Sequence, residues 1–156
     1  MPIKIYQRCE VQTMSREAYF TMDLSLYSEN ITDIIAAFNN AGWGWRDEVK
    51  EYLPLHDDDM FGYQEEKIPV EQLFSVIKSK QECGELCGVR LYHRYSDRGI
   101  VLLVKNTKEV MVSIDINRKL LCGDFTDISW YVENIAAKLE EAGCTVFSLE
   151  YHEYIG

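Results

Sequence analysis

Residues 89–116 read VRLYHRYSDRGIVLLVKNTKEVMVSIDI and carry the clearest structural signal in this chain of 156 residues. Three runs rich in β-branched and aromatic residues, 89–95, 100–105 and 109–116, are separated by SDRG and NTK. These separators contain turn-forming residues and have lengths that suit β-hairpins. The stretch therefore predicts an antiparallel meander of three strands, and residues 118–122 can add a short fourth strand after a turn at Asn117.

The strongest helical pattern follows the meander, over residues 126–142. Its apolar side chains recur at helical spacing, Thr126 or Asp127 can cap its first turn, and Gly143 follows its end. An earlier helix, which Ser28 can cap, has the same apolar pattern and the same Ala-Gly ending when shifted by 101 residues. An ancient duplication would explain this correspondence, and so would a chance match between two amphipathic helices.

The remaining elements complete a small α+β domain. Pro69 suits the first turn of a third helix, which should end near Lys80. Strands are predicted over residues 3–12, 19–26 and 144–151. The sequence thus predicts one domain over residues 1–156, in which about three helices pack on one face of a mainly antiparallel sheet.

The composition is typical of a folded protein of the cytoplasm. Hydrophobic residues make up 47% of the chain, which is too apolar for a disordered segment. The five cysteines are an odd number, and the first ten residues do not resemble a signal peptide. No run approaches the roughly 18 apolar residues that a membrane span needs. We therefore expect a cytoplasmic location and reduced thiols.

The net charge of −10 is concentrated in the middle of the chain. Residues 51–88 contain 3 basic and 9 acidic side chains and so contribute −6 of that charge. This sign argues against binding to nucleic acid or to an anionic membrane surface, because both require Lys and Arg. A basic protein is the expected partner.

The densest acidic stretch runs from residue 51 to residue 66 and contains no Lys or Arg. Aromatic and other apolar side chains are interspersed, and such residues are favoured at interfaces. The stretch falls in a connection without clear periodicity, and long irregular connections are often functional. Its acidic residues are Glu51, Asp57, Asp58, Asp59, Glu65 and Glu66, and its interspersed apolar residues are Tyr52, Met60, Phe61 and Tyr63.

Metal and cofactor sites are not predicted. Asp57, Asp58 and Asp59 lack the ligand spacing of an EF-hand, and three consecutive side chains of an extended loop do not converge on one ion. Cys83 and Cys87 have the separation of half a zinc site, but no second pair of ligands accompanies them.

No catalytic residue is predicted either. The chain contains no G-x-S-x-G elbow, P-loop, Rossmann fingerprint or H-E-x-x-H motif. Strand alternation places His93 on the same face as Leu91 and Tyr95, which favours a structural role. Trp43-Gly44-Trp45 precedes the acidic stretch and favours core packing over a binding surface.

The leading functional prediction is a small bacterial protein that neutralises a basic partner, as an immunity protein or antitoxin blocks a toxin nuclease. Clustered carboxylates would speed association, and aromatic side chains would slow release. The alternatives are an adaptor or structural subunit, an enzyme with an unrecognised site, a solvated loop without a role, and a loop whose carboxylates pair with Arg90, Arg94 or Arg98 of the same molecule. The predicted partner-binding residues are Asp57, Asp58, Asp59, Glu65, Glu66, Tyr52, Phe61, Tyr63 and Trp45.

Overall fold

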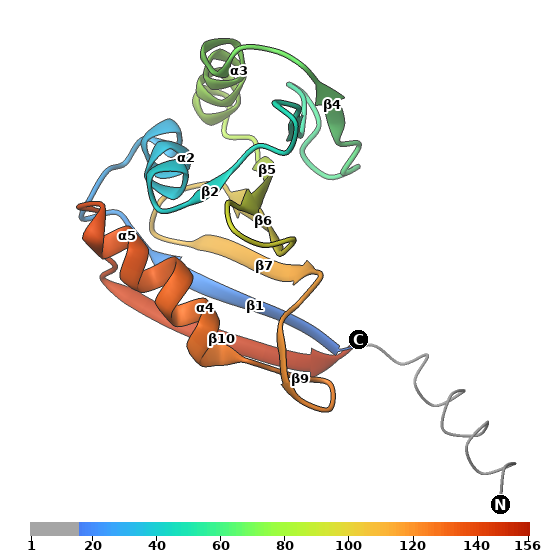
Figure 1. Ribbon diagram of the computed structural model, residues 1–156. Coiled ribbons are helices and arrows are strands. Elements are labelled where there is room, and N and C mark those ends of the chain that lie inside the picture. Colours follow the sequence, from blue (N-terminus) through green and yellow to red (C-terminus); the bar gives the residue numbers. More distant parts are fainter. Residues whose placement is uncertain (1–15) are drawn as a thin grey trace, which may run out of the picture.

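The computed structural model describes residues 16–156, so Cys9 and the strand predicted over residues 3–12 lie outside the described part of the chain. The chain folds around an eight-stranded antiparallel sheet (Figure 1). Seven strands follow the order β10-β1-β7-β6-β5-β3-β4, and β2 pairs with the end of β5. The strands are β1 (Arg16–Asp23), β2 (Trp43–Gly44), β3 (Lys50–Tyr52), β4 (Gln64–Glu66), β5 (Cys87–His93), β6 (Gly99–Val104), β7 (Val110–Ile116) and β10 (Ser148–Ile155).

Three helical segments pack against this sheet, which confirms the predicted α+β class. The first two are α2 (Ile31–Asn40) and α3 (Val70–Glu82). The third is continuous from residue 128 to residue 141 and comprises α4 (Ile128–Tyr131), a π-helical turn η1 (Val132–Ala136) and α5 (Ala137–Glu141). No helix in the described part of the chain is long and apolar enough to cross a membrane.

The helices cover one face of the sheet. Phe20, Val112 and Leu102 lie opposite one another on β1, β7 and β6, and all three are buried with the apolar side chains of the helices. The next positions along β1 and β6, Tyr19 and Val101, project from the other face and are half-buried. This alternation is the period of two that the meander sequence predicts.

The fourth meander strand forms but does not join the main sheet. Strand β8 (Leu120–Cys122) pairs instead with β9 (Phe125–Thr126) in a separate two-stranded sheet. Asn117 adopts a left-handed conformation with φ of 51°, which turns the chain away from β7. The prediction was right about the strand and wrong about its neighbour.

Element ends differ from the predictions in further places. Strand β1 spans Arg16–Asp23, whereas residues 19–26 were predicted. Helix α2 begins at Ile31 with Asn30 as its N-cap residue, and the Ser28 hydroxyl donates to the carboxylate of Asp33 in the first turn instead of capping the helix. Strand β10 begins four residues later than predicted, at Ser148, where pairing with Asp23 of β1 becomes available. Asp127 does cap the last helix, because its side chain accepts a hydrogen bond from the Trp130 amide.

Candidate functional site

The acidic stretch is bounded by two short strands. Strands β3 and β4 pair antiparallel, so that Glu51 lies opposite Glu65 and Tyr52 lies opposite Gln64. The expectation of a wholly irregular connection is therefore wrong at its two ends. Each strand has three residues, which is too short to produce a visible alternation in the sequence.

The base of the loop between these strands is fastened to helix α3 by Lys80. This side chain has no exposed surface. Its ammonium group donates to the carbonyl oxygens of Pro54 at 2.8 Å and Asp57 at 2.7 Å, and it lies 3.3 Å from the carboxylate of Glu85. Glu85 also accepts a 2.7 Å hydrogen bond from the His56 amide, which is a further contact to the segment that follows β3.

Asp57 shapes the end of the loop. Its carboxylate accepts hydrogen bonds from the amides of Met60 at 3.1 Å, Phe61 at 3.0 Å and Gly62 at 2.7 Å. Phe61 has a left-handed φ of 54°, a conformation that these bonds hold in place. The predicted partner-binding role of Asp57 is thus joined by a structural role that the sequence did not reveal.

Arg90 neutralises part of the acidic stretch. In the sheet it lies opposite Glu51, and its guanidinium group is 3.5 Å from the Glu51 carboxylate and 4.0 Å from that of Glu65. The same guanidinium covers the ring of Tyr63 at 4.1 Å, and burial raises the pKa of this tyrosine to about 12. Internal pairing therefore accounts for two of the six carboxylates, and Arg90 is the arginine that provides it.

Tyr52 lies in the core. Only 5% of its surface is exposed, and its hydroxyl group donates a 2.9 Å hydrogen bond to Glu66. Burial, together with this hydrogen bond, raises the Tyr52 pKa to about 12. A partner cannot reach the Tyr52 ring, so Tyr52 can contribute to an interface only by holding the Glu66 carboxylate in position through this hydrogen bond.

The tip of the loop is exposed, and we call it the acidic tip and define it as Asp58, Asp59, Met60 and Phe61. Met60 is 83% exposed and Phe61 is 49% exposed. Asp58 accepts a 2.5 Å hydrogen bond from the Leu86 amide, and Asp59 is exposed. Met60 was not among the predicted binding residues, although its position between Asp59 and Phe61 was a signal that could have identified it.

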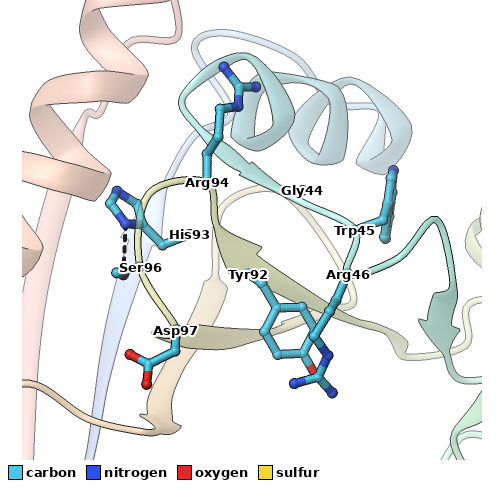
Figure 2. Close-up of a pocket in the computed structure, with 8 residues that line it drawn as sticks. All are labelled: Gly44, Trp45, Arg46, Tyr92, His93, Arg94, Ser96 and Asp97. Atoms are coloured by element: carbon cyan, nitrogen blue, oxygen red, sulfur yellow. Dashed lines mark hydrogen bonds between the residues drawn. The ribbon is translucent and has the colours of Figure 1, made fainter.

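Trp45 lies apart from the acidic tip. It follows strand β2, whose Trp43 is fully buried and whose Gly44 pairs with Tyr92 of β5. The half-buried Trp45 lines a cavity of about 330 Å³ between this segment and the β5–β6 hairpin (Figure 2). The structure therefore places Trp45 next to Arg46, Tyr92 and His93 in this cavity. Trp45 also lines a second cavity with Lys50 and Lys67, and Lys50 lies opposite Glu66 of β4.

Comparison of the chain with family models, curated proteins and solved structures found no match. Any function must therefore be argued from the surface itself. Within residues 16–156, no group of three or more His, Cys, Asp or Glu side chains is arranged to hold a metal ion.

Proposed function

We propose that this chain binds a basic protein through the acidic tip and the neighbouring strand β4, in the way that an immunity protein or antitoxin blocks a toxin nuclease. One observation carries the proposal: Met60 and Phe61 are exposed on a loop whose backbone is fixed by Asp57 and Lys80. A preformed loop loses little conformational entropy on binding. Apolar side chains held outward in this way are available to a partner.

The charges around these two side chains specify the kind of partner. Asp58, Asp59 and Glu66 have no Lys or Arg within 4.0 Å among residues 16–156. Their negative charges are therefore not neutralised by an ion pair within this part of the chain and can attract a basic partner. Glu65 shares Arg90 with Glu51 and is 63% exposed. Carboxylates at the rim of an interface speed the encounter with a basic surface, and desolvated apolar anchors slow dissociation.

The apolar anchors are tested by capture of the partner from the native host. The double variant Met60→Ser/Phe61→Ser should lose a basic protein that the unmodified chain captures. Leu26→Ser/Tyr95→Ser is the matched control, because Leu26 is 66% and Tyr95 is 83% exposed elsewhere on the surface. The control should capture as much partner as the unmodified chain. Equal capture by the tip variant, or a captured protein that is not basic, would contradict the proposal.

The charges are tested by the association rate with the purified partner. Asp59→Asn/Glu65→Gln should slow association several-fold at low salt and have little effect at high salt. Glu109→Gln/Glu133→Gln removes the same charge from other exposed positions and is the control. Asp57 is left unchanged because its carboxylate fixes the loop. A rate that does not respond to the tip charges at low salt would remove the electrostatic part of the proposal.

The activity of the partner distinguishes an inhibitor from an adaptor. If the captured protein is a nuclease, a stoichiometric amount of the unmodified chain should abolish its activity, and the Met60→Ser/Phe61→Ser variant should not. Stable capture without any inhibited activity would favour the adaptor alternative instead.

A further inference from the structure

We propose that the cavity beside Trp45 binds a small organic anion, a planar ring that bears one carboxylate group. The cavity has a volume of about 330 Å³ and is formed by β2, the residues that follow it and the β5–β6 hairpin (Figure 2). This volume is at the lower end of the range for small-molecule sites. The site is lined by none of the residues of the acidic tip, so the inference does not rest on the proposed function.

Arginines without an acidic partner provide the first observation. Arg46 and Arg94 both line the cavity, and Arg98 lies in the adjacent turn. The Arg46 guanidinium is the candidate anion ligand, because the Arg94 guanidinium points away from it in Figure 2 and donates to the Asn39 carbonyl at 3.5 Å. Within residues 16–156, no carboxylate oxygen lies within 4.0 Å of these three side chains. In a protein with 26 acidic and 16 basic residues, such arginines retain their capacity to bind an anion. The other arginines of this part of the chain, Arg16, Arg90 and Arg118, each have a carboxylate partner.

Aromatic rings provide the second observation. The guanidinium carbon of Arg46 lies 4.1 Å from the centre of the Tyr92 ring, which holds the side chain at the edge of the cavity. Trp45 forms a further wall, and the ammonium group of Lys50 lies 5.5 Å from the centre of its ring. A stacked guanidinium is already oriented for a carboxylate or phosphate, so less entropy is lost on binding. The rings favour a ligand with a flat apolar body.

The polar groups deeper in the site are also fixed. His93 Nδ1 lies 2.8 Å from the Ser96 hydroxyl. The His93 ring is packed between Trp43 and Trp130, with ring centres 5.0 Å from each. These contacts give the site a rigid wall instead of a mobile one.

Asp97 sets a limit on the charge of the ligand. Its carboxylate lines the same cavity and would repel a second negative charge. It can also accept a hydrogen bond from a hydroxyl or amino group on the ring. The arrangement therefore favours a ligand with one negative charge over a multiply charged phosphate.

Binding is tested by amide NMR titration with sodium benzoate at constant ionic strength. Inorganic phosphate and benzylamine serve as comparison probes. Benzoate should give saturable shifts at Gly44, Trp45 and residues 92–97, phosphate should bind more weakly, and benzylamine should not bind. Phosphate binding tighter than benzoate at the same residues would overturn the preference for a ring, and no saturable shift with either anion would overturn the site.

Three arginine variants test whether the carboxylate of the ligand binds inside the cavity. Arg46→Gln should weaken benzoate binding about tenfold or more, the size of effect expected for a charged hydrogen bond. Arg94→Gln should weaken it less, because the Arg94 guanidinium points away from Arg46 and donates to the Asn39 carbonyl. Arg98→Gln is the matched control, because Arg98 has no carboxylate partner either but donates to the Asn117 carbonyl at 2.9 Å and does not line the cavity. Its affinity should stay within about twofold, since rim charges that make no contact contribute little. An equal loss in all three variants would show general attraction to a basic hairpin and overturn the site, provided that thermal unfolding shows each variant folded.

Discussion

Lys80 shows at the scale of one residue why the loop has a fixed shape. Removing an ammonium group from water costs several kcal/mol unless its hydrogen-bonding capacity is satisfied. Two backbone carbonyls and one carboxylate satisfy this group, so the position of residues 54–57 depends on helix α3. A lysine in the last turn of a helix is usually exposed. Its burial was not predictable because the two carbonyl acceptors come from residues more than twenty positions away.

Changing Lys80 to Met should therefore destabilise the fold by about 3 kcal/mol, since it leaves the carbonyl groups of the loop base without their donor. Lys78→Met is the control on the same helix, because Lys78 is exposed. The control should change the free energy of unfolding by less than about 0.5 kcal/mol. Urea unfolding of both variants measures the difference. Equal stability of the two variants would show that the three bonds to Lys80 contribute little.

Contacts between residues far apart in the sequence also decide which of the predicted binding residues are accessible to a partner. The sequence identified the acidic stretch correctly as a concentration of charge, because composition is visible without a structure. It did not show that Tyr52 is buried, that Asp57 binds backbone amides or that Arg90 covers Tyr63. Each of these facts depends on strand pairing or loop closure, which the residue types alone do not determine.

At the scale of elements, periodicity decided what could be predicted. Helices α2 and α3 and the three meander strands are long enough for their period to appear in the sequence, and all were predicted within a few residues. Strands β3 and β4 are too short for their period to appear; β3 pairs with the edge of β5, and β4 pairs in turn with β3. The π-helical turn in the last helix was also missed, since its apolar positions fit an ordinary α-helical period.

The cap of that last helix is a testable feature. Asp127 accepts a hydrogen bond from the Trp130 amide at 3.3 Å and pairs with the Lys119 ammonium group at 3.0 Å. Asp127→Ala should lower the free energy of unfolding by about 1 kcal/mol, and Asp127→Asn should lose less because it retains the cap. Asp124→Ala, at an exposed position three residues earlier, should have little effect. Urea midpoints that rank Asp124→Ala below Asp127→Ala would contradict this role of the cap.

At the scale of the whole molecule, stability should fall in two steps as the pH is lowered. Burial lowers the pKa of His93, although its hydrogen bond to Asn134 opposes the shift. The unfolded chain therefore binds a proton below about pH 6.5 that the folded chain does not bind, and stability declines from that pH downward. Burial acts to raise the pKa of Glu153, but hydrogen bonds from Tyr151, Arg16 and Thr126 lower it to about 2. The stability that Glu153 contributes is thus present above its usual pKa of about 4.3 and is lost as the pH falls toward 2.

Urea unfolding between about pH 7.5 and pH 3 separates the two steps. His93→Gln should remove the decline between about pH 6.5 and pH 5, and His152→Gln, which changes a half-exposed imidazole, should not. Glu153→Gln should lower stability at neutral pH and flatten the curve below about pH 4. An unchanged curve for His93→Gln above pH 5 would mean that the imidazole titrates alike in the folded and unfolded chains.

The enclosure of Lys80 also has a consequence for chemical labelling. An amine-directed acetylating reagent should modify the exposed lysines of the chain rapidly, whereas Lys80 can react only when the loop base separates from helix α3. Its acetylation rate, followed by mass spectrometry of proteolytic fragments, then measures how often that separation occurs in the native state. A bound partner at the acidic tip would slow this one rate while the other lysines kept theirs, so a single buried amine would report occupancy of a surface that it does not touch.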